Sequence, residues 1–86
     1  MRRTVVLFGR EGCCLCDEAR EVVLRVQAKH PFAFEERDIE QDDALLHAYL
    51  ERIPVITIDG REAFELFVDG DELARRLTDP RPPSDP

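Results

Sequence analysis

Residues 4–16 read TVVLFGREGCCLC, so an apolar run leads into three closely spaced cysteines. Residues 4–8 are mostly β-branched or aromatic, which predicts a strand, and a helical pattern of apolar residues begins just after the cysteines. Cys13 at the first turn of that helix meets free backbone N–H groups and the positive end of the helix dipole, which favour its thiolate. Cys16 lies one turn further in, within reach of a disulfide with Cys13, as expected of a resolving thiol.

The rest of the chain continues to alternate between strand-like and helix-like patterns. Apolar residues recur at helical spacing up to Val26, and Pro31 prevents the helix from continuing. Asp69 followed by Glu72 resembles a capping box and predicts the start of a last helix. By the same criteria we expect three further strands, at 32–37, 53–58 and 61–66, and one short helix at 42–51. An acidic turn is expected over 38–43.

Two connections determine how the strands pair. A strand-helix-strand crossover makes the first two strands parallel, and Asp59-Gly60 is a two-residue hairpin turn that makes the last two antiparallel. The predicted fold is α/β, with the order β-α-β-α-β-β-α and a four-stranded mixed sheet with helices on both faces. The near-continuous apolarity of residues 4–8 suits a central strand covered on both faces. Residues 1–78 are expected to form one domain, and the proline-rich residues 79–86 a flexible tail.

Composition narrows the range of partners and compartments. The 86 residues carry a formal net charge of −7, which argues against a nucleic-acid or anionic-membrane partner, and no apolar run is long enough to span a membrane. Arg2-Arg3 precedes only a short apolar run with no cleavage site, so we expect no leader and a cytoplasmic monomer. In a reducing compartment, a Cys-x-x-Cys pair is typical of redox activity or metal binding.

Together these residues resemble the thioredoxin fold in its short, glutaredoxin-like form. The resemblance rests on the strand, the Cys-x-x-Cys pair at a helix start, Ile53-Pro54 opening the third strand and the Asp59-Gly60 hairpin, and it spans roughly residues 4–77. It implies that Cys13 and Cys16 are the catalytic residues. It also implies that Ile53-Pro54 is a cis peptide bond beside the dithiol, and that Ile53 and Pro54 bind an extended substrate segment.

The sequence departs from a typical glutathione-using glutaredoxin at several positions. Cys13-Cys14-Leu15-Cys16 replaces Cys-Pro-Tyr-Cys, and it looks closer to a small glutaredoxin-like subgroup with a Cys-x-Leu-Cys site whose substrates are poorly defined. Arg10 stands where a lysine often binds a glutathione carboxylate, so it is a candidate substrate-binding residue. Asp69 follows Val68 where paired glycines usually precede the last helix. It is a further substrate-site candidate, although an acidic side chain repels a carboxylate and Asp69 is expected to cap the helix itself.

These residues support three hypotheses. In the first, the protein is a thiol-disulfide oxidoreductase that exchanges its Cys13-Cys16 dithiol with a protein disulfide or a glutathione mixed disulfide, and a separate thiol reductant restores it. No cofactor is expected, and glutathione is a candidate co-substrate. In the second, the same cysteines carry a metal or iron–sulfur cluster with the help of an exogenous thiol or a second subunit. In the third, the domain is a non-catalytic binding module with incidental thiols. We interpret Cys14 as an exposed bystander, with a second resolving thiol or an oxidation-prone site as alternatives.

Overall fold

The computed structural model describes residues 3–78. The predicted element order β-α-β-α-β-β-α is confirmed, with one short 3-10 helix added in the acidic turn. The elements are β1 (Thr4–Gly9), α1 (Cys14–Lys29), β2 (Ala33–Asp38), η1 (Ile39–Gln41), α2 (Asp43–Tyr49), β3 (Val55–Ile58), β4 (Arg61–Glu65) and α3 (Gly70–Thr78). The predicted tail, 79–86, lies outside the described residues.

The sheet has the strand order β2-β1-β3-β4, so β1 is an interior strand as predicted. β1 runs parallel to β2 and antiparallel to β3, and β3 is antiparallel to β4. Because of this pairing, the end of β1, the start of β3 and the end of β4 lie side by side, at the edge of the sheet that is formed by strand ends rather than by an edge strand. The loops at that edge carry the dithiol and the Ile53-Pro54 bond.

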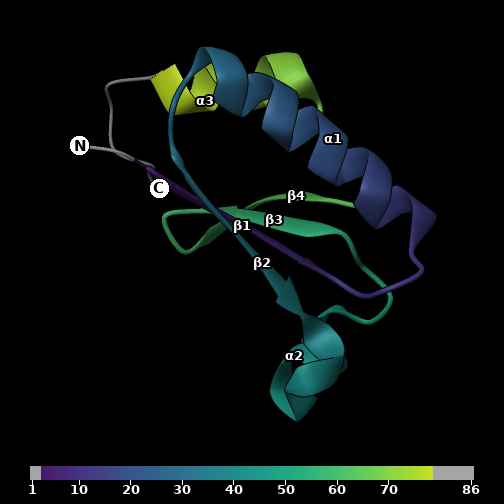
Figure 1. Ribbon diagram of the computed structural model, residues 1–86. Coiled ribbons are helices and arrows are strands. Elements are labelled where there is room, and N and C mark those ends of the chain that lie inside the picture. Colours follow the sequence, from purple (N-terminus) through teal and green to yellow (C-terminus); the bar gives the residue numbers. More distant parts are fainter. Residues whose placement is uncertain (1–2, 79–86) are drawn as a thin grey trace.

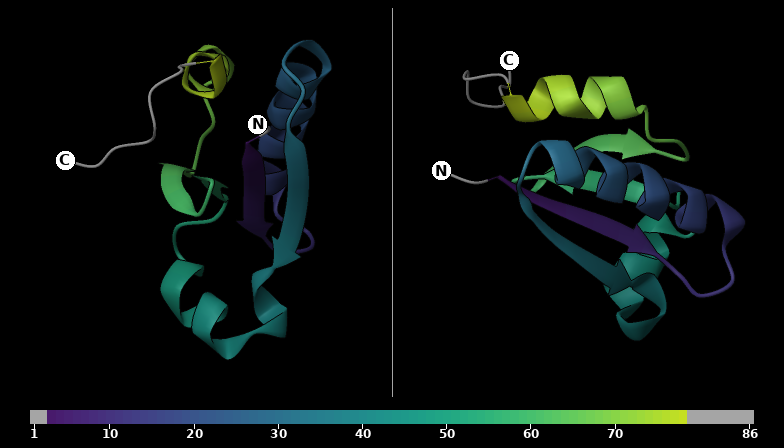
Figure 2. Two further views of the ribbon diagram at one scale, coloured as in Figure 1. Left: turned by 90° about the vertical axis from the view of Figure 1, so that its left-hand side faces the viewer. Right: turned by 45° about the horizontal axis from the view of Figure 1, so that its top comes forward.

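The helices lie on both faces of the sheet, as predicted. α1 and α3 lie together over one face, and α2 lies at the opposite side of the molecule (Figures 1 and 2). Between α1, α3 and the sheet lies the main core, which contains Val5, Ala19, Val23, Val26, Phe32, Ile56, Ile58 and Leu73. α2 packs through Tyr49 on Phe8 of β1, with ring centroids 5.0 Å apart.

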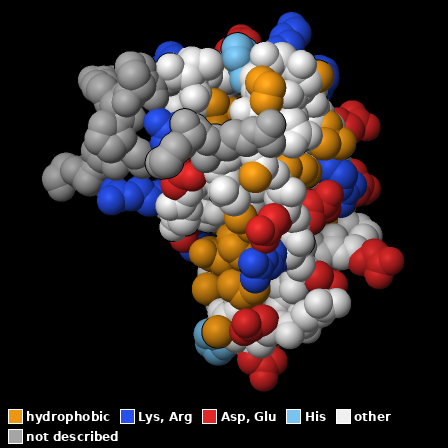
Figure 3. Space-filling view, turned by 60° about the vertical axis from the view of Figure 1, so that its left-hand side comes forward, with side chains coloured by type: hydrophobic (Ala, Val, Ile, Leu, Met, Phe, Trp, Pro, Cys, Tyr) orange, Lys and Arg blue, Asp and Glu red, His pale blue; other side chains and the backbone are white. Residues whose placement is uncertain are grey.

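The two faces of β1 are not equally covered, and here the expectation of a strand buried on both faces is wrong. Val5 and Leu7 are buried, whereas Val6 and Phe8 are half-buried. The reason is that α2 has only seven residues and packs on the Phe8 end of the second face. Figure 3 shows a patch of apolar side chains in the lower half of the view, with charged side chains beside it.

The Asp59-Gly60 hairpin is confirmed. Asp59 has a φ of 52° and Gly60 a φ of 87°, the pair of positive values that a type I′ turn requires. The Asp59 carboxylate also accepts a hydrogen bond from the Thr4 backbone N–H at 2.9 Å and pairs with Arg3 at 3.0 Å. The turn therefore fixes the register of β3 and β4 and fastens the hairpin to the start of β1.

The third strand begins two residues later than predicted. The Ile53-Pro54 peptide bond is cis, as the family resemblance implied, and the β3 ladder begins at Val55. Since proline has no backbone N–H, it cannot donate to a ladder. Its carbonyl instead accepts a hydrogen bond from the Leu66 N–H at 2.8 Å, just beyond β4. This bond holds the Pro54 loop beside the chain that leaves β4.

No helix within residues 3–78 has the length and apolar character needed to cross a lipid bilayer.

Candidate active site

The dithiol lies where β1 passes into α1. β1 ends at Gly9, and Gly12, with a φ of 82°, turns the chain into the helix. Cys13 is the N-cap residue of α1, with extended backbone angles, and its Sγ accepts a hydrogen bond from the Cys16 backbone N–H at 3.3 Å. Sulfur thus takes the place of the oxygen that usually caps a helix. An ionised Cys13 would have both this donor and the helix dipole to stabilise it.

The three cysteines differ sharply in exposure. Cys13 is half-buried, Cys14 is exposed and Cys16 is buried, with 1% of its surface exposed. All three are free thiols, and a side-chain hydrogen bond links Cys16 to Cys13. As predicted, the capping thiol is the more accessible of the pair and the thiol beneath it is shielded, whereas their attacking and resolving roles stay predictions.

Burial raises the pKa of the Cys16 thiol from its ordinary value to about 11. The hydrogen bond with the Cys13 side chain and the charges of Cys13 and Asp17 raise it as well, whereas a backbone hydrogen bond from Arg10 lowers it. Cys16 therefore remains a neutral thiol at physiological pH while Cys13 is free, since an uncompensated charge in a buried position is costly.

Gly9 makes room for the buried sulfur. A Cβ atom at this position would lie 2.7 Å from Cys16 Sγ and 3.2 Å from Cys16 Cβ, which is closer than packed atoms approach. From the sequence, Gly9 was expected only to end a strand. A glycine ending a buried strand directly before a Cys-x-x-Cys loop is the pattern that could have identified this close approach.

Ile53 and Pro54 lie beside the dithiol. Ile53 is buried in a second apolar cluster with Cys16 and Ile39, and Cys13 packs against that cluster. The structure thus places Ile53 at the dithiol and Pro54 next to it through the cis peptide bond, whereas their binding of a substrate stays a prediction.

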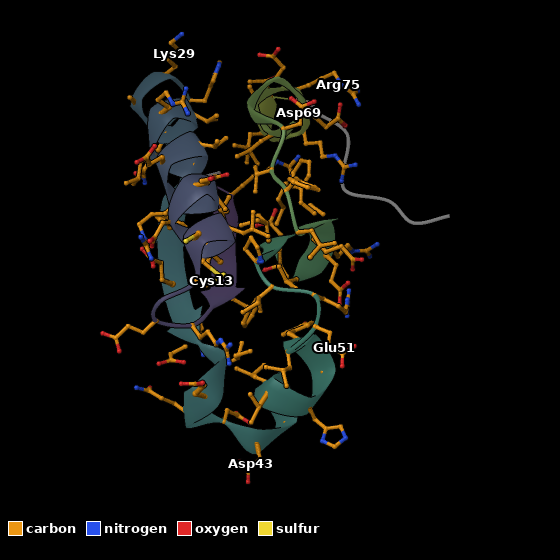
Figure 4. The ribbon with its side chains drawn as sticks, turned by 90° about the vertical axis from the view of Figure 1, so that its right-hand side faces the viewer. Cys13, Lys29, Asp43, Glu51, Asp69 and Arg75 are labelled. Atoms are coloured by element: carbon orange, nitrogen blue, oxygen red, sulfur yellow. The ribbon has the colours of Figure 1, made fainter. Side chains whose placement is uncertain are left out.

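Arg10 and Asp69 already have partners. Arg10 is exposed and pairs with Glu40 at 3.4 Å. Asp69 caps α3, as expected, by accepting hydrogen bonds from the backbone N–H groups of Asp71 and Glu72 at 3.0 and 3.2 Å. In Figure 4, Asp69 lies toward the Lys29 end of the molecule, well separated from Cys13. The substrate-binding roles of Arg10 and Asp69 stay predictions, and the observed role of Asp69 is the cap.

Arg52, which precedes Ile53, was not predicted from the sequence to support the site. Its guanidinium pairs with Glu65 at 2.8 Å and with Glu62, and it lies over the Tyr49 ring at 5.4 Å from the centroid. These contacts join the Pro54 loop to β4 and to α2. Nothing in the local sequence indicates the pairing, because it depends on where the hairpin folds back.

An open cavity of about 260 Å³ adjoins Cys16 on the β2 side of the dithiol. Its wall includes Gly9 and the ion-paired Arg20, which contacts Asp17 at 2.9 Å and Glu36 at 2.8 Å. Among the described residues, no three His, Cys, Asp or Glu side chains are arranged to hold a metal ion. The metal-carrier hypothesis also involves a second subunit or an added thiol, so this finding does not test it.

Comparison with known proteins agrees with this geometry. The fold is that of thioredoxin: a thioredoxin mutant from Halobacterium salinarum has a TM-score of 0.66 at 23% identity, covering 93% of this chain and 78% of that chain. The family model of the glutaredoxin-like domain (DUF836) matches residues 4–78, so the chain belongs to that family.

Two structures of higher identity are also similar. Protein Ne2328 from Nitrosomonas europaea is 31% identical with a TM-score of 0.80, over 91% of this chain and 94% of that chain. Protein XcR50 from X. campestris is 34% identical with a TM-score of 0.72, over 85% of this chain and 93% of that chain. None of the curated proteins matches the chain. The family and the fold together support a function of the thiol-redox type.

The difference between the cysteines predicts selective alkylation. At about pH 8, iodoacetamide should label Cys13 and Cys14 of the reduced, folded protein and spare Cys16, because only an accessible thiolate reacts. Labelling of Cys16 should rise only as the pH approaches about 11, or after denaturation with guanidinium. Fragment-ion mass spectrometry assigns the label. Alkylation of Cys16 as fast as Cys14 in the folded protein would contradict this assignment.

The packing of Gly9 predicts a coupled pair of substitutions. Gly9→Ala should destabilise the protein by about 1–3 kcal/mol, the usual range for overpacking, because its Cβ meets Cys16 Sγ. In a Cys16→Ala background the same change should cost clearly less, since the sulfur is gone. Urea unfolding of the four proteins in this double-mutant cycle measures the coupling. An equal cost of Gly9→Ala in both backgrounds would show that the sulfur contact is not responsible.

Proposed function

We propose that the protein is a thiol-disulfide oxidoreductase. The Cys13 thiolate attacks one sulfur of a substrate disulfide, forming a Cys13-substrate disulfide and releasing the other sulfur as a thiolate that takes up a proton. Cys16 then loses its proton and attacks Cys13 Sγ, which forms the Cys13-Cys16 disulfide and releases the second substrate thiol. The substrate disulfide gains two electrons from the Cys13-Cys16 dithiol. A separate thiol reductant then supplies two electrons to the Cys13-Cys16 disulfide and restores both thiols.

The observation that carries this proposal is the contact between a capping thiol and a buried thiol. Cys13 Sγ lies at the N-terminus of the 16-residue helix α1 and accepts a backbone N–H there, an environment that favours a thiolate. Cys16 lies directly beneath it and is hydrogen-bonded to it. Cys13 also packs against the apolar cluster that contains Cys16, so a disulfide between the two would join side chains that are already neighbours.

The same contact explains why Cys16 reacts only after Cys13 has reacted. While Cys13 is free, its charge and its hydrogen bond help to raise the pKa of Cys16. Once Cys13 is joined to the substrate its negative charge is gone, so the pKa of Cys16 falls and its thiolate becomes easier to form. The resolving step is therefore favoured by the formation of the intermediate that it resolves.

The Pro54 loop supports a binding mode for the substrate. Ile53 lies in the apolar cluster against which Cys13 packs, and an extended substrate segment would pair with the Ile53 backbone in the manner of strand addition. A protein disulfide and a glutathione mixed disulfide are the two substrate classes, with Arg10 available to a glutathione carboxylate if it leaves Glu40. The proposed setting is a cytoplasmic monomer that needs no cofactor.

Three serine variants test the assignment of roles. Cys13→Ser should abolish turnover of a model disulfide in the presence of a thiol reductant, because no nucleophile remains. Cys16→Ser should accumulate the Cys13-substrate disulfide, which intact-mass spectrometry detects. Cys14→Ser is the matched control and should retain activity, since Cys14 is exposed and is not expected to take part in the exchange. An active Cys13→Ser protein, or inactivation by Cys14→Ser alone, would refute the proposal.

A further inference from the structure

A group of exposed apolar side chains lies beside the dithiol. Phe67, which follows β4, is 71% exposed, the most of any large apolar side chain among the described residues. Leu66 and Leu15 are 38% and 37% exposed. We call these three residues the Phe67 patch. A phenylalanine exposed in this way contributes little to the core, and grouped exposed apolar side chains commonly mark an interaction site.

Contacts on both sides place the Phe67 patch against the dithiol. The Leu66 N–H donates to the Pro54 carbonyl at 2.8 Å, so the patch begins at the Pro54 loop. The chain then runs to Gly70, where a Cβ atom would lie 3.3 Å from Val22 Cγ1 on α1. Leu15 shares that side of α1 with Val22, because the two are seven residues, or about two helical turns, apart. The segment that carries Leu66 and Phe67 therefore runs from Pro54 to the side of α1 on which Leu15 also lies.

The corner that presents Phe67 is held in an uncommon conformation. Leu66 has a φ of 72°, a left-handed value that branched apolar residues rarely adopt. Two hydrogen bonds at 2.8 Å maintain it, from Leu66 N–H to the Pro54 carbonyl and from Phe67 N–H to the Glu65 carbonyl. Strained backbone of this kind persists where the surroundings impose it, commonly at ligand-binding sites. The aromatic side chain is thus presented by a fixed corner.

The charged side chains near the dithiol that form no ion pair are acidic. Glu18 lies one turn beyond Leu15 on α1, and Glu11 lies two residues before Cys13; both are exposed and form no ion pair within the described part of the chain. The arginines nearest the dithiol are neutralised by carboxylates. Their pairs are Arg10 with Glu40, Arg20 with Asp17 and Glu36, and Arg52 with Glu62 and Glu65. Glu11 lines the cavity on the β2 side of Cys16, so the unpaired negative charges lie around the dithiol, in a chain whose net charge is −7.

From this combination, and resting on the function proposed above, we infer the substrate class: an extended segment of another protein that carries a bulky apolar residue and a basic residue close to its disulfide-bonded cysteine. The Phe67 patch receives the apolar side chain, and Glu11 and Glu18 attract the basic one. Charge complementarity of this kind selects partners and speeds their encounter. Glutathione, which is small and anionic, offers neither feature, so its mixed disulfides are poor substrates.

Matched peptide disulfides test the inference. Three short peptides carry one cysteine activated as a 2-pyridyl disulfide, and the flanking residues are arginine and leucine, glutamate and leucine, or arginine and glycine. Release of pyridine-2-thione reports the rate constant of Cys13 attack once the contribution of the other accessible thiol, Cys14, is subtracted with the Cys13→Ser protein. The wild-type protein should react with the arginine-leucine peptide about tenfold faster than with either of the others, and faster than with the 2-pyridyl disulfide of glutathione. The advantage of arginine over glutamate should shrink as salt is added.

Two variants assign the preferences to residues. Phe67→Ser should reduce the leucine-to-glycine ratio of rate constants toward one, and the double variant Glu11→Gln/Glu18→Gln should do the same to the arginine-to-glutamate ratio. Leu24→Ser and Asp43→Asn are the controls and should leave both ratios unchanged. Leu24 is 46% exposed and lies further along α1, and Asp43 lies far from Cys13 in Figure 4.

The outcomes separate this inference from the proposed function. A wild-type protein that reacts with none of the disulfides refutes the oxidoreductase function itself. Equal rate constants for all peptides, or faster reaction with the glutathione disulfide, would overturn the substrate class and leave the oxidoreductase intact. Ratios that do not change in the Phe67→Ser and glutamate variants would likewise overturn the roles of those residues.

Discussion

The contact of Cys16 Sγ with the backbone at Gly9 is the constraint on which the site depends. Because this glycine has no side chain, α1 can begin directly over the end of β1 with a sulfur buried between them. That placement makes Cys16 a neutral, shielded thiol and leaves Cys13 at the helix cap, where its Sγ accepts the Cys16 N–H. One close approach at the strand-helix junction thus places a buried thiol, Cys16, beside a more accessible one, Cys13.

The opposite wall of the site is held from β4. The Leu66 N–H bonds to the Pro54 carbonyl, and Arg52 reaches across to Glu62 and Glu65, so the edge strand fixes the Pro54 loop at both of its ends. The same segment then presents Phe67 to solvent. The Pro54 loop and the corner at Phe67 therefore depend on a single hairpin, whose turn at Asp59-Gly60 sets their register.

Local patterns in the sequence predicted the parts of this structure that local physics controls. A few neighbouring residues predicted that Cys13 stands at the start of a helix, that Asp59-Gly60 forms a hairpin turn and that Asp69 caps the last helix. All three features are observed. The unequal covering of β1, the role of Gly9 and the ion pairs of Arg52 were not predicted. Each depends on which segments meet after folding: how far α2 reaches, which side chain lies over a glycine, and which strand passes Arg52. The cis Ile53-Pro54 bond was expected only through family resemblance.

The central claim is that Cys13 and Cys16 form a reversible disulfide pair. Its most direct test is to equilibrate the protein with glutathione redox buffers, quench with acid and map the disulfides by mass spectrometry. The account predicts that the oxidised protein loses two hydrogens, that the bond joins Cys13 to Cys16, and that more reducing buffer restores both thiols while Cys14 stays outside the bond. A protein that keeps three free thiols across all buffers, or that pairs through Cys14, would contradict it.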